Sequence, residues 1–112
     1  MAELVVDVDS VTVQLSAAEK LESLHSDVTV PRSSVTSARV AVDGIAEVHG
    51  LRAPGTSVPG VLVVGTFHAQ GRRTFAVCHR RRPAVVLELT GQAFDRLVVT
   101  VDAPQAVVDR LV

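Results

Sequence analysis

Hydrophobic and polar residues alternate in short runs along most of this chain. Val11, Val13 and Leu15 alternate with Thr12 and Gln14, and this period of two predicts a strand with one buried face and one wet face. Similar Val-rich runs recur between turn residues such as Gly, Pro and Asp. They predict further strands at 4–8, 28–30, 35–42, 61–69, 74–78, 84–89 and 96–101.

A first helix signal follows the second of these runs. Ser16 and Glu19 have capping-box spacing, in which the serine hydroxyl accepts a hydrogen bond from the N–H three residues on. The glutamate in turn accepts one from the N–H of the serine. The pattern predicts a short helix over about 17–24, and we expect Leu21 and Leu24 to be its contacts with the core.

A second helix is predicted at the C-terminal end. Asp102 precedes Pro104, and a proline in the first turn of a helix loses no hydrogen bond. Val107, Val108 and Leu111 then fall on one helix face. We expect this face to dock on the sheet.

Segment 49–60 is the longest stretch without a regular pattern. It contains three Gly and two Pro, which predicts a loop, and a loop of this length is often functional. Shorter turns at 70–72 and 79–83 join the strands that follow. Short turns imply antiparallel neighbours, so we expect the strands between 61 and 89 to form a meander.

Length and composition set the fold class. The chain has 112 residues, so we expect a single domain over 1–112. Apolar residues make up 47% of it and aromatic residues only 3%, so the core must be aliphatic, and Val packs well on a pleated sheet. We predict a mostly β (α+β) domain, an antiparallel sheet of about seven strands rolled into a split β-barrel and capped by the C-terminal α-helix.

Several phrases of the sequence resemble a known family. The run at 28–40, Val-Thr-Val-Pro-Arg-Ser-Ser-Val-Thr-Ser-Ala-Arg-Val, and the run at 96–104, which leads into a helix, resemble bacterial pleckstrin-homology-like (PH-like) domains. The runs at 50–60 and 82–89 are similar to a group of short, uncharacterised actinobacterial proteins. The resemblance covers most of residues 3–111. It implies a seven-stranded split barrel capped by one helix, with binding or oligomerisation as its role, and supplies no catalytic motif.

Charge and cysteine content narrow the class of partners. The net charge of −1 gives no general attraction to nucleic acid or to a membrane surface, and the scarcity of aromatic side chains further disfavours nucleic acid. The single cysteine excludes an intrachain disulfide. We see no signal-peptide pattern and no apolar run near the ~20 residues that span a bilayer. We therefore expect a cytoplasmic protein.

Arginines cluster at the two short turns. Arg72 and Arg73 follow the first turn, and Arg80, Arg81 and Arg82 form the second. Because arginine binds phosphate and carboxylate groups through paired hydrogen bonds, both clusters are candidates for anion recognition. Consecutive turns of a meander lie at opposite ends of the sheet, which would make two separate patches. The alternative is that these side chains only keep the turns soluble.

The 50–60 segment is a second candidate for anion recognition. Its glycines allow backbone N–H groups to turn towards an anion, and no Gly-Lys-Ser/Thr follows, so it is not a nucleotide-binding P-loop. The alternative is a rigid connector packed on the barrel. For an anionic ligand, the predicted binding residues of this loop and of the second turn are Arg52, Thr56, Arg80, Arg81 and Arg82.

The histidines and the cysteine have no metal-site spacing. A metal needs three or four converging ligands, and neither Cys-x-x-Cys nor His-Glu-x-x-His occurs among these residues. Cys78 and His79 are adjacent in a predicted strand, so they should point to opposite faces, and we expect Cys78 to be a small buried residue. We predict neither a metal nor a cofactor. The other histidines considered are His25, His49 and His68.

The favoured function is a non-catalytic PH-like binding or scaffold module that acts through protein–protein contact or self-association. Segments 61–64 and 85–87 are apolar on both faces, which favours a dimer or small ring unless the terminal helix and the long loop cover them. The alternative is a binder of an anionic ligand, either a lipid headgroup or a phosphorylated small molecule.

An enzyme is the third possibility. Its active site would form only between subunits, with His68 or His79 meeting a carboxylate across the interface. Within one subunit, Asp7 and Asp9 are two apart on a strand and could share a face, as a hydrolase pair would. No apolar pocket lies beside them to raise a pKa, so we interpret them as a polar strand face or turn.

Overall fold

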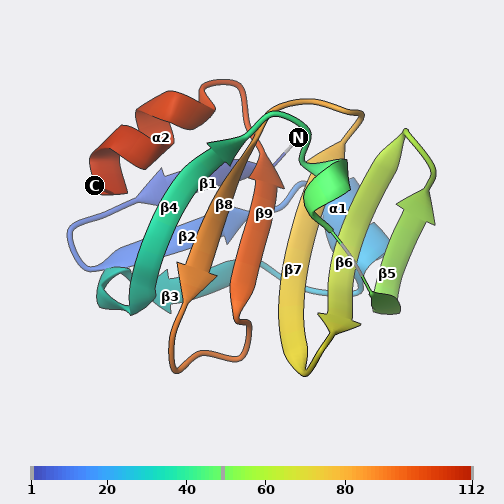
Figure 1. Ribbon diagram of the computed structural model, residues 1–112, viewed down its shortest axis with the longest axis horizontal. Helices are drawn as coiled ribbons and strands as arrows, with labels where there is room; N and C mark the ends of the chain where they lie inside the picture. The colour runs from blue at the N-terminus through green and yellow to red at the C-terminus, as the bar shows by residue number, and fades with distance from the viewer. Residues whose placement is uncertain (1, 49, 112) are drawn as a thin grey trace.

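The computed structural model describes residues 2–48 and 50–111, and of residues 51–54 it describes only the backbone. Strands make up most of the regular structure in these ranges (Figure 1). Two short 3-10 turns, η1 (Arg32–Ser34) and η2 (Ile45–Glu47), flank β4. The elements in chain order are β1 (Glu3–Val6), β2 (Ser10–Gln14), α1 (Ala17–Ser23), β3 (Val28–Pro31), β4 (Val35–Ala41), β5 (Leu51–Val58), β6 (Leu62–Ala69), β7 (Arg72–His79), β8 (Ala84–Leu89), β9 (Arg96–Thr100) and α2 (Pro104–Leu111).

The strands form two sheets that lie face to face (Figure 1). β1, β2 and β3 make a small antiparallel sheet, and the larger sheet has the strand order β4-β8-β9-β7-β6-β5. The prediction of a mostly β domain with a C-terminal helix is therefore confirmed. The described strands make two separate sheets and not one closed barrel.

The predicted meander is wrong at one step, between β7 and β8. β6 and β7 are antiparallel neighbours as expected, but β9 lies between β7 and β8, parallel to β7 and antiparallel to β8. Strands two places apart in a sheet are separated by about 10 Å, and four extended residues reach about 13 Å. The connection at 80–83 can therefore skip one strand. A short turn limits where the next strand can begin, but it does not determine which strand the next strand pairs with.

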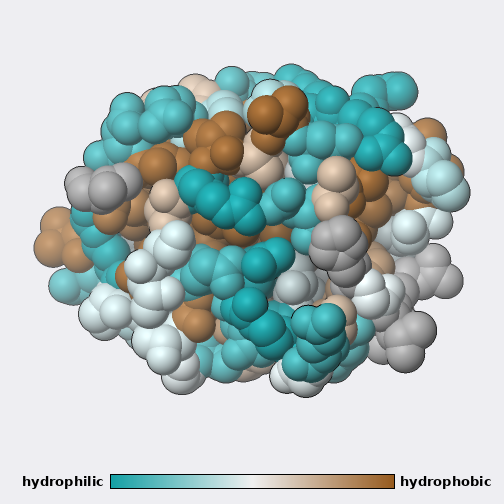
Figure 2. All heavy atoms as spheres, viewed as in Figure 1, coloured by the Kyte–Doolittle hydropathy of each residue, from teal (hydrophilic) through white to brown (hydrophobic). Residues whose placement is uncertain are grey.

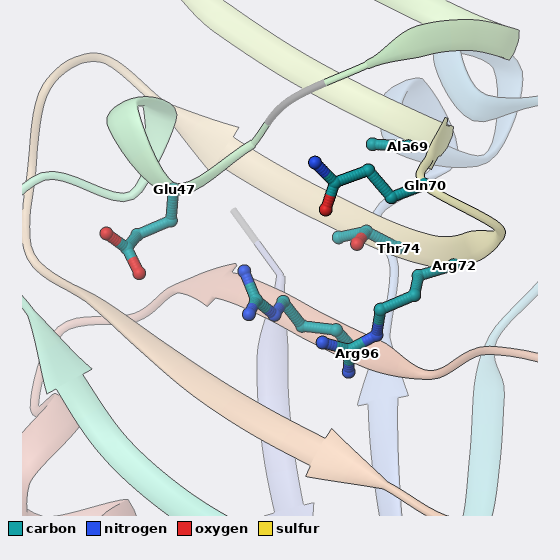
Figure 3. A pocket seen from close by; sticks show the side chains of 6 residues that line it. All are labelled: Glu47, Ala69, Gln70, Arg72, Thr74 and Arg96. Carbon is teal, nitrogen blue, oxygen red and sulfur yellow. The ribbon is translucent and has the colours of Figure 1, made fainter.

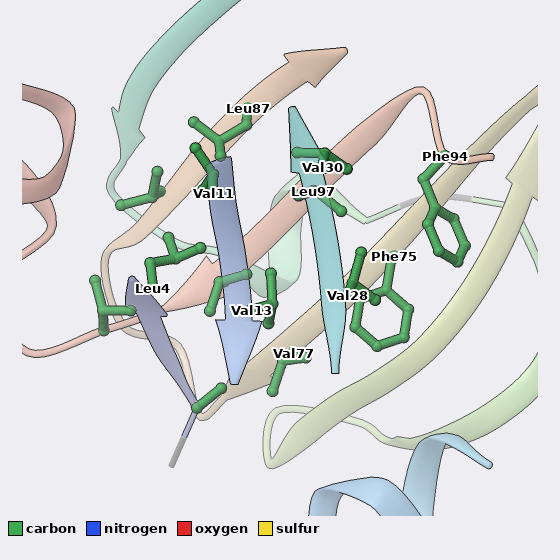
Figure 4. Close-up of a cluster of buried hydrophobic side chains, with 14 of the residues drawn as sticks. Leu4, Val11, Val13, Val28, Val30, Phe75, Val77, Leu87, Phe94 and Leu97 are labelled. Carbon is green, nitrogen blue, oxygen red and sulfur yellow. The ribbon is translucent and has the colours of Figure 1, made fainter. Parts of the chain in front are cut away.

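The main hydrophobic core lies between the two sheets (Figure 4). Val11 and Val13 of β2 are completely buried and Leu15 nearly so, which confirms the predicted alternation. They pack with residues of the larger sheet, among them Phe75 and Leu97, which are also completely buried. The buried face of the small sheet is therefore aliphatic, as the composition predicts.

A second, smaller apolar cluster covers the other face of the six-stranded sheet, which we call the outer face. Cys78, Val86 and Val98 are completely buried there, and Ile45 and Val48 of the η2 segment pack over the cluster. β6 and β8 are thus apolar on both faces, as expected. Neither the terminal helix nor the 50–60 segment supplies the described apolar cover of this cluster, because α2 packs into the main core instead.

α1 begins with the predicted capping box but buries a different face. The Glu19 N–H donates to Ser16 Oγ at 3.2 Å, and the Ser16 N–H donates to Glu19 Oε1 at 2.8 Å. The prediction that Leu21 and Leu24 contact the core is wrong, because they are 75% and 69% exposed. Glu19 and Ser23 are buried in their place. The carboxylate of Glu19 bonds to groups outside the helix, and these bonds turn the polar side of α1 inward.

α2 docks as predicted. Val108 is buried in the main core, and Val107 and Leu111 pack against that core. The helix lies along β4, β8 and β1, so it covers one side of the contact between the two sheets. No helix within 2–48 or 50–111 has the length and apolar character needed to cross a bilayer.

The predicted loop at 49–60 is wrong for most of its length, because β5 occupies residues 51–58. β5 is an edge strand that pairs antiparallel with β6, and the register shifts between Arg52 and Gly55. An edge strand bonds to a neighbour on one side only, so Pro54, which has no N–H to donate, is tolerated there. The Gly and Pro content that predicts a loop is thus compatible with a bulged edge strand.

Candidate functional site

Polar side chains occupy one part of the outer face, beside the apolar cluster. The strand register places Glu88 opposite Arg96, and Arg96 opposite Thr74. Residues opposite one another on paired strands share a face, so these three residues lie in one row across β8, β9 and β7. Figure 2, which views this face, shows hydrophilic side chains across its middle.

Glu88 is the centre of an ion-pair network. Its Oε1 accepts a hydrogen bond from Arg72 Nη2 at 2.6 Å, and its Oε2 accepts one from Arg96 Nε at 2.7 Å. Partial burial on its own would raise the pKa of Glu88, but the hydrogen bonds from the two guanidinium groups outweigh it and lower that pKa. The ionised carboxylate therefore holds both arginines in fixed positions.

A hollow of about 250 Å³ opens next to this network (Figure 3). Arg72 and Arg96 line it from β7 and β9, and Glu47 of η2 stands on its other side. Arg39 of β4 pairs with Glu47. The rest of the lining consists of Ala69, Gln70 and Thr74.

The arginines around the hollow have hydrogen-bond donors that their ion pairs do not use. Arg39 pairs with Glu47, and Arg72 and Arg96 pair with Glu88, while the negative charge of Asp95 also acts on Arg72. Each guanidinium has five N–H donors and stays charged at any physiological pH, and the bonds to Glu88 use one nitrogen of each partner. The remaining donors are available to hold a small oxyanion, with the Thr74 hydroxyl as a neutral donor beside them.

The predicted arginines of the second turn lie elsewhere. Arg80, Arg81 and Arg82 follow the far end of β7 from Arg72, so the two arginine clusters are separate patches, as predicted. Arg81 Nη1 lies 2.7 Å from Asp43 Oδ2, and this hydrogen bond lowers the pKa of Asp43. Arg82 Nη2 lies 3.8 Å from Asp102, and Arg80 is exposed. The turn therefore has carboxylates of its own.

The two predicted residues of the 50–60 segment have different positions. The backbone of Arg52 pairs with Phe67, which pairs with Thr74, so Arg52 has the same register position along the sheet as the network. The Arg52 side chain lies outside the described residues. Thr56 Oγ1 donates to the Glu22 carbonyl at 2.9 Å, which ties β5 to α1. The register thus places Arg52 towards the opposite end of the sheet from the 80–82 turn.

The histidines that the structure describes, His25, His68 and His79, are dispersed, and Cys78 lies apart from them. Cys78 lies in the outer cluster while His79 reaches Glu19 of α1, which confirms that they face opposite sides. Cys78 is completely buried, and this burial raises the pKa of its thiol to about 12. His25 packs against Phe75 and Phe94.

No three His, Cys, Asp or Glu side chains of residues 2–48 and 50–111 are grouped to hold a metal ion. His68 is exposed on β6, and Asp7 and Asp9 are exposed between β1 and β2. His49, another of the histidines considered, lies outside the described residues. His68, Asp7 and Asp9 do not line the hollow.

Sequence reasoning missed Arg39, Glu88 and Arg96. One signal was available, because Glu88 is the only charged residue in an otherwise apolar strand, at a position that shares the face of Val86. A charge at such a position needs a partner on a neighbouring strand. Arg96 could not be named as that partner, because the sequence does not show that β9 lies beside β8.

Comparisons with known proteins add no name to this site. No protein-family model matches the chain, and neither a curated protein nor a solved structure matches it. The function is therefore inferred from the side chains described above.

Proposed function

We propose that this chain is a non-catalytic binding module that holds a small oxyanion on the outer face of its six-stranded sheet. The observation that carries the proposal is the Glu88 network, which fixes Arg72 and Arg96 at the edge of a hollow of about 250 Å³. Oxyanions of phosphate or carboxylate type accept paired hydrogen bonds from such fixed guanidinium groups. Arg39 adds a third positive charge on the neighbouring side.

The chemistry of the hollow supports binding over catalysis. Arginine keeps its proton near neutral pH, and the lowered pKa of Glu88 keeps that carboxylate ionised, so neither exchanges protons readily at pH 7. The buried thiol of Cys78 is protonated at that pH. The hollow can therefore position an anion, and Glu47, the other carboxylate beside it, is paired with Arg39.

A PH-like relationship and a cytoplasmic setting belong to the same proposal. Two facing sheets with a C-terminal helix beside them support the relationship, although the parallel β7–β9 pair departs from a purely antiparallel split barrel. A single buried, reduced cysteine fits a reducing compartment.

Isothermal titration with inorganic phosphate, sulfate and citrate tests the oxyanion site. We expect Arg72→Gln and Arg96→Gln each to weaken binding about tenfold, the effect of losing one charge-assisted hydrogen bond. Arg80→Gln is the matched control, because it removes the same charge at the other end of β7. Circular dichroism checks that each variant folds. Equal binding by all three variants, or no binding of any anion to the wild type at millimolar concentration, would refute the proposal.

A second candidate function is self-association. Leu21 of α1 is 75% exposed, Leu24 at the C-terminal cap of that helix is 69% exposed, and Val58 of β5 is 42% exposed. A hydrogen bond from Thr56 to the Glu22 carbonyl ties α1 to β5, which is the edge strand of the larger sheet. A strand edge can pair with the same strand of a second copy around a twofold axis. We propose a second copy of this chain as the partner for that edge.

A further inference from the structure

Glu47 differs from the other residues of the hollow because it comes from the cover of the outer face and not from the sheet. Its carboxylate pairs with Arg39, and Figure 3 shows Arg96 extending across the hollow towards it. The side chains of Glu47 and Arg39 are 28% and 48% exposed, so solutes can reach this pair. A carboxylate of the protein thus already stands beside the arginines of the hollow.

The backbone of the η2 segment is held firmly on the sheet. The Gly44 N–H donates to the Arg82 carbonyl at 2.9 Å, and the Ile45 N–H donates to Asp43 Oδ1 at 3.0 Å. Gly44 approaches the sheet so closely that an added Cβ would lie 2.7 Å from Ala84 Cβ. With Ile45 and Val48 packed on the outer cluster, the backbone of this segment stays in place while the Glu47 side chain, which is 28% exposed, can rotate.

We infer that Glu47 is a built-in competitor for the ligand of this site and that the ligand is the dianion of a phosphate monoester. The inference rests on the proposed oxyanion function. A bound anion would displace the Glu47 carboxylate from Arg39 by rotation of its side chain, without movement of the η2 backbone.

The charge of the competitor selects the charge of the ligand. Exchanging the Glu47 carboxylate for another singly charged group replaces one interaction with an equivalent one. A phosphate monoester near pH 7 carries up to two negative charges and three acceptor oxygens, so it gains a second ionic interaction with the three arginines. A carboxylate or a phosphate diester, each with one negative charge, gains little by the same exchange.

Titrations of wild type and Glu47→Gln with inorganic phosphate, glycerol 3-phosphate, dimethyl phosphate and acetate test this inference. We expect Glu47→Gln to bind inorganic phosphate about tenfold more tightly than wild type, because an amide does not compete for the guanidinium groups. Glu3→Gln is the matched control, since it makes the same charge change on the exposed side of β1. In the wild type, glycerol 3-phosphate should bind more tightly than either singly charged anion.

A further experiment distinguishes two possible sources of the phosphate monoester, a lipid headgroup and a small molecule in solution. Vesicles of phosphatidylcholine with phosphatidic acid present the group on a lipid surface, whereas glycerol 3-phosphate presents it in solution. Glu47-dependent binding to the vesicles alone assigns the site to a lipid headgroup, and Glu47-dependent binding in solution assigns it to a small molecule. Either result supports the shared chemistry.

Two results would overturn the inference while the oxyanion function stands. The first is a wild type that binds phosphate through Arg72 while Glu47→Gln binds it no better than Glu3→Gln does. The second is equal affinity of the wild type for dimethyl phosphate and glycerol 3-phosphate. Absence of binding to every anion would instead refute the oxyanion function, and the competitor role with it.

Discussion

At the scale of single residues, Glu88 shows how one carboxylate can organise a sheet surface. Exposed ion pairs contribute little to stability, about 0–1 kcal/mol, because water competes for both partners. The Glu88 side chain is only 23% exposed and accepts hydrogen bonds from two arginines on neighbouring strands. Its main effect is therefore to fix the geometry of Arg72 and Arg96, with a modest gain in stability.

Glu88→Gln should lower the free energy of unfolding by about 1 kcal/mol at pH 7, because the amide cannot accept two charge-assisted hydrogen bonds. The folded-state pKa of Glu88 is lowered from 4.5, so its contribution is present above pH 4.5 and is lost as the pH falls through the folded value. Urea denaturation followed by circular dichroism measures both effects. A stability difference that stays constant between pH 7 and acid would contradict this assignment.

At the scale of elements, α1 is joined to the rest of the molecule by a buried carboxylate. Glu19 is 1% exposed, and its Oε2 accepts a hydrogen bond from the Ala2 N–H at 3.0 Å and lies 2.6 Å from His79 Nε2. Its Oε1 accepts from the Ser16 N–H within the capping box. One side chain thus links α1 to the residue before β1 and to the end of β7. This link explains why the polar face of the helix is buried.

Glu19→Ala should destabilise the protein by about 3 kcal/mol, because it leaves buried hydrogen-bond donors without an acceptor. Ser16→Ala removes only the other half of the capping box and should cost about 1 kcal/mol. Burial on its own would raise the pKa of Glu19, but the hydrogen bonds from Ser16 and His79 outweigh it. The pKa of Glu19 is therefore lowered from 4.5. The Glu19 contribution is therefore present above pH 4.5 and lost in acid. Equal costs for the two variants in urea denaturation would show that Glu19 acts only as a cap.

At the scale of the whole molecule, local signals in the sequence predicted most of the elements, and the missing information concerned β5 and the arrangement of the strands. The capping box and the Val11–Leu15 alternation depend on neighbouring residues, and both are confirmed. The exposure of Leu21, the strand at 51–58 and the insertion of β9 depend on residues distant in the sequence. The candidate site spans β4, β7, β8, β9 and η2, so it could not be assembled before the strand order was known.

The exposed leucines of α1 give a test of self-association. If a second copy pairs at the β5 edge, Leu21→Glu with Leu24→Glu should shift sedimentation from dimer towards monomer. These exposed positions should change the free energy of unfolding of the monomer by no more than about 0.5 kcal/mol. Val8→Glu is the control, because Val8 is 86% exposed between β1 and β2 on the small sheet. A wild type that sediments as a monomer at high concentration would exclude this interface.

The insertion of β9 also matters while the protein is being made. In the larger sheet, β4 and β8 meet β7, β6 and β5 only through β9. β9 follows β4, β5, β6, β7 and β8 in the chain, so β7 and β8 each offer an open edge until β9 takes its place between them. A chain cut before Arg96 would therefore expose two strand edges and be more prone to aggregate than the chain with β9.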